Sequence, residues 1–136
     1  MKAFYSILCF LIVVIYPSFA QQRGNDTLRI LAVGNSFSDD AMEYLPALLA
    51  DLEIKDVELA RLYVGGCSLQ RHVAFHNNGE APYVFNLSKA GENRWQQQKG
   101  TYSLQQVLSM GEWDIITLQQ QSGFSGIYDS FEPHLG

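Results

Sequence analysis

Three short segments of the sequence carry the residue types that nucleophilic chemistry needs. Residues 34–36 (Gly-Asn-Ser), 65–67 (Gly-Gly-Cys) and 119–123 (Gln-Gln-Gln-Ser-Gly) each follow directly after an apolar run. A serine hydroxyl can attack an acyl carbon if a base accepts its proton and N–H donors stabilise the oxyanion. Ser36 is therefore the candidate nucleophile. The backbone N–H of Gly66 and a side-chain amide of the third segment are the candidate donors.

The first of these segments also fits an ordinary turn before a helix. In that interpretation Ser38 or Asp39 caps the helix, and Ser36 has no chemical role. Asp39 and Asp40 favour a helix N-terminus there, and the apolar spacing predicts a helix over residues 39–52. Pro46 predicts a kink or a restart within it. Nucleophile and turn stay open as alternatives at this point.

The apolar runs indicate strands that would bring the three segments together. Residues 28–33 and 113–118 are apolar almost throughout, which is typical of parallel strands buried on both faces, and residues 57–64 form a further strand. Shorter helices are predicted over residues 68–76 and 103–110, and a β-hairpin within residues 83–100. This order predicts an α/β domain with a parallel sheet. Ligands of such sheets bind beyond the carboxyl ends of the strands.

The first 20 residues have the pattern of a secretory signal peptide. Lys2 precedes an apolar run over residues 7–15, and small residues at Ser18 and Ala20 fit a cleavage site after Ala20. The run is too short for a membrane span, so we expect an exported, periplasmic or extracellular protein without a membrane anchor. Residues 21–27 form a polar lead-in, and the domain occupies residues 28–136.

Charge and composition exclude several kinds of partner. The net charge is −5 with no basic patch, so we expect no nucleic-acid partner. His72 and His76 have the spacing of metal ligands on a helix, but a third ligand is missing and a solvated helix face is the favoured interpretation. We expect no metal and no cofactor.

Three further residues have alternative interpretations. Cys67 could be a thiol nucleophile, although a small buried residue is the favoured interpretation. Trp95 and Tyr83 could stack on a sugar ring or close the sheet.

Three ordered motifs resemble those of a known superfamily. The segments ILAVGNSFSDD, YVGGCSLQRH and WDIITLQQQSG are similar to successive blocks of the SGNH/GDSL hydrolases, and most of all to a secreted domain-of-unknown-function branch with a G-N-S-F-S first block. The resemblance implies a flavodoxin-like, three-layer fold with sheet order 2-1-3-4-5. It also implies Ser36 as nucleophile and Gly66 as an oxyanion glycine. In the third block, Gln121 is the favoured amide donor and Gln119 the second choice.

The resemblance also implies that part of the hydrolase domain is missing. The superfamily supplies its acid and base from a D-x-x-H block, whereas His134 here has Phe131 three residues earlier. The chain then contains no base and no acid, and it looks like the N-terminal part of a domain from a frameshift, a premature stop or a truncated gene prediction. Such a fragment would be inactive alone, and the strand over residues 113–118 would become an exposed edge that favours self-association.

Two functions follow from these expectations. The preferred one is a serine hydrolase for ester bonds, with carbohydrate O-acyl esters inferred as substrates from export and the resemblance. The alternative is a carbohydrate-binding or interaction protein that kept the fold without the chemistry.

Overall fold

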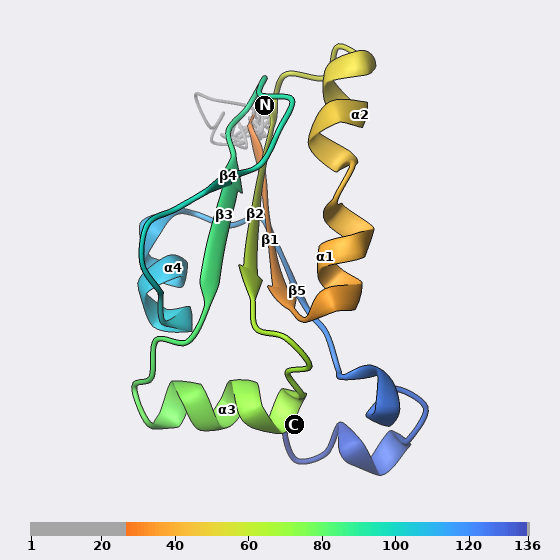
Figure 1. The fold of residues 1–136 in the computed structure, drawn as a ribbon, viewed down its shortest axis with the longest axis vertical. Helices are drawn as coiled ribbons and strands as arrows, with labels where there is room; N and C mark the ends of the chain where they lie inside the picture. The colour runs from red at the N-terminus through yellow and green to blue at the C-terminus, as the bar shows by residue number, and fades with distance from the viewer. Residues whose placement is uncertain (1–26, 136) are drawn as a thin grey trace, which may run out of the picture.

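The computed structural model describes residues 27–135 and forms an α/β domain (Figure 1). Its strands are β1 (Leu28–Gly34), β2 (Val57–Tyr63), β3 (Val84–Ser88), β4 (Gln96–Gln97) and β5 (Ile115–Leu118). Its helices are α1 (Ser36–Met42), α2 (Leu45–Asp51), α3 (Leu69–Asn77) and α4 (Leu104–Met110), followed by 3₁₀ turns at Ser122–Phe124 and Tyr128–Ser130. The predicted signal peptide and most of the lead-in lie outside the described residues.

The strands form one mixed sheet in the order β4-β3-β2-β1-β5. Its centre is parallel: β1 pairs with β2 on one side, with Leu28 opposite Val57, and with β5 on the other, with Ile30 opposite Ile115. The predicted α/β class and the order of these three strands are confirmed. The predicted hairpin is present as β3 and β4, which run antiparallel and extend the sheet beyond β2.

Helices cover both faces of the sheet, and α3 crosses its lower end (Figure 1). The α1–α2 pair lies against one face and α4 against the other, while α3 and the 3₁₀ turns lie beyond the carboxyl ends of β1, β2 and β5. Side chains alternate between the faces because successive strand residues point to opposite sides. The core toward α4 contains Leu31, Val33, Ala60, Leu62, Tyr83, Phe85 and Val107.

The first helix begins earlier than its acidic residues suggest. Asn35 is extended and its side-chain oxygen accepts from the Phe37 N–H at 3.2 Å, which makes Asn35 the N-cap. Neither Ser38 nor Asp39 is the cap, because an asparagine cap three or four residues upstream already satisfies the free N–H groups. The predicted restart is confirmed, since α1 ends at Met42 and Pro46 lies in the first turn of α2.

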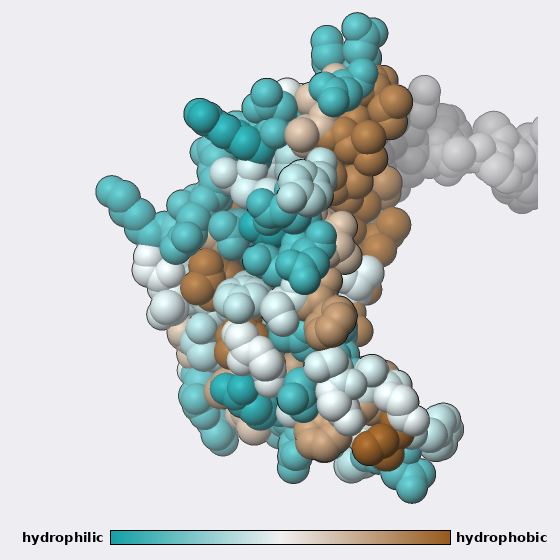
Figure 2. All heavy atoms as spheres, turned by 45° about the vertical axis from the view of Figure 1, so that its right-hand side comes forward, coloured by the Kyte–Doolittle hydropathy of each residue, from teal (hydrophilic) through white to brown (hydrophobic). Residues whose placement is uncertain are grey.

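The strand β5 is an edge strand whose side chains are exposed on both faces. Ile115, Ile116 and Leu118 are 44%, 52% and 42% exposed. Leu48 on α2 and its C-cap residue Leu52 are exposed as well. Figure 2 shows apolar side chains gathered in a band along one side of the molecule. The expected apolar edge at residues 113–118 is thus present in the fold.

None of the helices within residues 27–135 is long and apolar enough to cross a membrane.

Candidate functional site

The side chain of Asn35 ties the three sequence segments together at the carboxyl end of the sheet. It is 1% exposed, and its Nδ2 donates to the Cys67 carbonyl at 3.0 Å and to the Gln120 carbonyl at 3.3 Å. Its Oδ1 caps α1 at the same time. One amide therefore bonds to the loop after β2, to the loop after β5 and to the helix that carries Ser36.

Ser36 is the first residue of α1 and is exposed to solvent. In the described part of the chain its hydroxyl has no hydrogen-bond partner. Gly34, two residues earlier, permits a close approach at this point: a Cβ there would lie 2.7 Å from the Cβ of Ser38 and 3.1 Å from the Oε1 of Gln119. The strand end must therefore be a glycine for the first and third segments to pack together.

Gly66 lies in the exposed turn after β2 with a φ of +57°. This left-handed conformation favours glycine. The turn is closed by a hydrogen bond from the Cys67 N–H to the Val64 carbonyl at 3.2 Å. Gly66 and Ser36 thus both follow the carboxyl ends of neighbouring strands, as the sequence predicted, and the Asn35 amide joins their two loops.

The three glutamines after β5 have three different environments. Gln119 lies beside Gly34, and its Oε1 is buried with no hydrogen-bond partner among the described residues. Gln121 has its side-chain amide near Gly123. Gln120 is buried: its Oε1 accepts from the N–H groups of Leu69 at 3.0 Å and Gln121 at 2.9 Å. The amide of Gln119 is therefore the one that packs against the segment of Ser36.

Arg61 on β2 anchors the helix that carries Ser36. Its guanidinium is largely buried and pairs with the carboxylates of Asp39 on α1 at 2.9 Å and of Glu43, the C-cap of α1, at 3.2 Å. The ring of Trp95 covers the guanidinium at 4.3 Å and its Nε1 donates to the carbonyls of Met42 at 3.1 Å and Glu43 at 3.2 Å. Trp95 therefore fastens the segment before β4 to the end of α1, and Arg61 occupies one face of its ring.

Cys67, His72 and Tyr83 form a buried polar cluster beneath α3. The Nδ1 of His72 lies 2.7 Å from the Tyr83 hydroxyl and 3.6 Å from the Cys67 Sγ. Burial lowers the pKa of His72 to about 4 and raises the pKa of both Cys67 and Tyr83, with Arg71 favouring the thiolate. All three groups are therefore neutral near pH 7.

The geometry of this cluster distinguishes between the interpretations that the sequence left open for its residues. Cys67 is a small buried residue, as favoured, and Tyr83 belongs to the core. The interpretation of both histidines as a solvated face is wrong for His72, which is 2% exposed because its ring stacks on Tyr83, while His76 is exposed. Within residues 27–135, no three His, Cys, Asp or Glu side chains are placed to hold a metal ion.

The sequence interpretation overlooked Asn35 and Gln120 as site residues. Asparagine is a preferred N-cap, so its place directly before a helix was a usable signal for Asn35. Gln120 gave no such signal, because a glutamine between two others is polar whichever way it points. Its burial depends on α3 and on Ser130, which the Gln120 Nε2 contacts at 2.9 Å through the backbone carbonyl.

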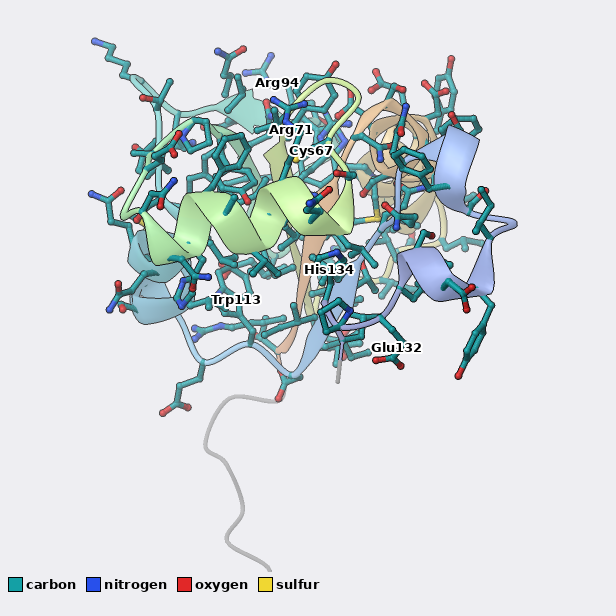
Figure 3. All side chains as sticks on the ribbon, turned by 90° about the horizontal axis from the view of Figure 1, so that it is seen from below. Cys67, Arg71, Arg94, Trp113, Glu132 and His134 are labelled. Atoms are coloured by element: carbon teal, nitrogen blue, oxygen red, sulfur yellow. The ribbon has the colours of Figure 1, made fainter. Side chains whose placement is uncertain are left out.

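Figure 3 views this edge of the sheet from below. Cys67 and Arg71 lie on one side of α3, and Glu132 and His134 lie on the other, near its first turn. The hydroxyl, the turn N–H and the amide needed for acyl transfer thus belong to segments that meet at one edge. Within the described residues, neither a histidine nor a carboxylate is hydrogen bonded to Ser36.

Comparisons with known proteins identify a family of unknown function. Residues 29–136 match the model described as "Domain of unknown function (DUF4886)". A crystal structure of a DUF4886 family protein from Bacteroides uniformis superimposes with a TM-score of 0.69 at 35% identity. The match covers 81% of this chain and 43% of that protein, so the chain spans less than half the length of its relative. No curated protein matches the chain.

Proposed function

Since this chain belongs to the DUF4886 family, we propose that the carboxyl edge of its sheet is the acyl-transfer centre of an SGNH-type serine hydrolase. The observation that carries the proposal is the Asn35 side chain, which bonds to the second and third segments while it caps the helix of Ser36. The three segments whose residue types suit acyl transfer are thereby held at one place.

Each candidate residue has a distinct role in this proposal. The Oγ of Ser36 attacks the ester carbonyl carbon and passes its proton to a base, the alcohol leaves with a proton, and water then hydrolyses the acyl-Ser36 bond. The N–H groups of Ser36 and Gly66 stabilise the oxyanion. Gln119 or Gln121 supplies a side-chain amide, and we place Gln119 first because its amide packs beside Gly34. Loss of one such donor typically costs about a hundredfold in rate.

The base is the part of the mechanism that the described residues do not supply at Ser36. Triad members act as a unit, so a chain without a base retains only a small share of the catalysis. We therefore propose that residues 29–136 contribute the nucleophile and the oxyanion donors, and that a D-x-x-H block outside them contributes the base and the acid.

We further propose that the protein is exported and acts on carbohydrate O-acyl esters. The predicted signal peptide supports export. The sugar assignment extends the resemblance to secreted hydrolases. We also propose that copies of the chain associate through β5, because this edge strand has neither a charge nor a proline to prevent pairing.

A chimera tests the hydrolase function. Residues 29–136 would replace the matched part of the Bacteroides uniformis protein, so that the rest of that protein can supply the proposed base and acid. A fluorophosphonate probe should label the chimera at Ser36, and Ser36→Ala should abolish labelling. Ser38→Ala is the matched control, since Ser38 lies on the same helix and should leave labelling within about twofold.

The competing function predicts a different outcome for the same chimera. A folded, monodisperse chimera that the probe does not label would overturn the hydrolase proposal and favour the non-catalytic carbohydrate-binding protein. The unbonded Ser36 hydroxyl is the observation that keeps this second function in consideration.

A further inference from the structure

A pocket of about 190 Å³ lies between the first turn of α3 and the turns that follow β5. Its walls include Ser68 and Gln70 from the start of α3, and Asp129, Glu132 and His134 from the later turns. Figure 3 shows Glu132 and His134 on the α3 side of these turns. This pocket is separate from the buried cluster of Cys67, His72 and Tyr83.

The buried side chain of Gln120 builds this pocket. Its Oε1 accepts from the Leu69 N–H at 3.0 Å, and its Nε2 donates to the carbonyl and hydroxyl oxygens of Ser130 at 2.9 and 3.2 Å. The Ser130 hydroxyl in turn donates to the Phe124 carbonyl at 2.8 Å. The hydrogen bonds of one amide thus fix α3 against the turns, and a preorganised wall lowers the entropic cost of binding.

Several polar groups of the pocket are left available for a ligand. The side chains of Gln70, Asp129, Glu132 and His134 make no hydrogen bond to any residue in the described range. The ring of Phe124 also lines the pocket and is 45% exposed. The pocket therefore combines unpaired amide, carboxylate and imidazole groups with one accessible apolar ring.

The chemistry of these groups narrows the class of ligand. Neither lysine nor arginine lines the pocket, and two carboxylates do, so an anionic ligand would be repelled. No metal-binding group of three His, Cys, Asp or Glu side chains occurs in the part of the chain that the structure describes. Carboxylate, amide and imidazole groups suit hydroxyl donors and acceptors, and Phe124 suits an apolar C–H surface. A sugar ring presents both.

We infer that this pocket binds one neutral saccharide unit. Its wall is continuous with the candidate acyl-transfer site, because the Gln120 carbonyl accepts from Asn35, the residue before Ser36. The assignment of the pocket as a substrate subsite rests on the proposed function. Saccharide binding itself does not, since it requires no reaction at Ser36.

Nuclear magnetic resonance titration of the ¹⁵N-labelled chain tests the inference. Methyl glucoside, methyl galactoside and N-acetylglucosamine are the probes, and glucuronate is the anionic control. We expect at least one neutral sugar to shift the amide signals of residues 68–71 and 128–134, with a Kd on the order of 1 mM. Glucuronate should bind at least about tenfold more weakly. The absence of shifts with all three neutral sugars, or equal binding of glucuronate, would overturn the inference.

Matched variants locate the binding. Gln70→Ala and Glu132→Gln should each weaken binding by about fivefold to tenfold, because each loses a hydrogen bond to the sugar. Both side chains are exposed, so the fold should persist, and Gln105→Ala on α4 is the surface control. Unchanged affinity in both pocket variants would contradict the assignment.

The two proposals fail separately in these experiments. Labelling of Ser36 without sugar binding would support the hydrolase proposal and overturn the saccharide-binding inference. Sugar binding without labelling of Ser36 would support the saccharide-binding inference and overturn the hydrolase proposal.

Discussion

The two edges of the sheet end in different ways. Beyond β2, the β3–β4 hairpin extends the sheet and finishes it with the two exposed glutamines of β4. Beyond β1, the sheet finishes with β5, which exposes Ile115, Ile116 and Leu118. Short polar edge strands resist pairing with another chain, whereas exposed apolar strands favour it. One side of the sheet is therefore protected and the other is open.

The difference teaches that composition alone does not tell a buried strand from an exposed one. Leu31 and Val33 on β1 are almost completely buried, and Ile115 and Ile116 on β5 are equally apolar but about half exposed. Both strands have the sequence of central strands of a parallel sheet. Their burial differs because β1 has a strand on each side and β5 is paired only with β1.

The largest loss of stability is expected for substitution of Asn35, which joins the loop after β2 to the loop after the edge strand β5. Asn35→Ala removes the helix cap and leaves the buried carbonyls of Cys67 and Gln120 unpaired, at a cost of about 4 kcal/mol in unfolding free energy. Urea denaturation measures this change in unfolding free energy. Asn35→Asp should keep the cap but lose both donors, whereas Asn78→Ala on the exposed end of α3 should change stability little. Equal effects of Asn35→Ala and Asn78→Ala would contradict this role.

The second largest effect is expected at low pH, where protonation of His72 should lower the unfolding free energy. Its pKa is lowered to about 4, below the value of about 6.5 in the unfolded chain, so the unfolded state binds more protons between these values. The stabilisation is complete above pH 6.5 and is lost as the pH falls toward 4, by about 3 kcal/mol. The unfolding free energy measured across this pH range should fall in the parent and in His76→Gln. A fall of the same size in His72→Gln would rule His72 out as its source.

The Trp95 anchor should contribute a smaller amount to the protected side. Trp95→Ala removes the ring over Arg61 and the hydrogen bonds to the carbonyls of Met42 and Glu43, which predicts a loss of about 2 kcal/mol. Amide exchange of β3 and β4 should accelerate as well. Trp95→Phe retains the ring without the N–H group and should lie between the parent and the alanine variant. Unchanged exchange in β3 and β4 would show that the hairpin is held in another way.

The smallest change in free energy is expected at the open edge. Ile116→Lys places a charge on β5 and should weaken the proposed self-association by about tenfold, about 1.4 kcal/mol, as measured by sedimentation. Gln97→Lys on β4 is the matched control at the protected edge and should leave association unchanged. If both variants, or neither, shift the association constant, the contrast between the edges has no part in assembly.

Sequence patterns predicted most of the fold because its signals are local. Continuous apolar runs indicated β1 and β5, Pro46 indicated the break between the first two helices, and the hairpin was anticipated within residues 83–100. The start of α1 was placed too late because acidic residues in a first turn resemble a cap. The antiparallel pairing of β3 with β2 could not be predicted in this way, because it depends on contacts between residues that are distant in the sequence.

The candidate site was predictable in its position and less so in its construction. Ser36 and Gly66 follow strand ends, so the edge at which they lie follows from the α/β class. Asn35 and Gln120 hold the segments together through bonds between distant residues, and such partners depend on the folded arrangement. His72 has the same difficulty, because a histidine on a helix becomes buried only when Tyr83 is placed against it.

The Asn35 bonds also join residues that are synthesised at different times. Asn35 is separated in sequence from Cys67 by 32 residues and from Gln120 by 85 residues. During synthesis, which proceeds from the N-terminus at roughly 5–20 residues per second, Ser36 leaves the ribosome well before its last supporting loop. A nascent chain that ends before Gln120 would carry the serine without the third segment. The hydrogen bonds of Asn35 can therefore be complete only after residue 120 has been synthesised.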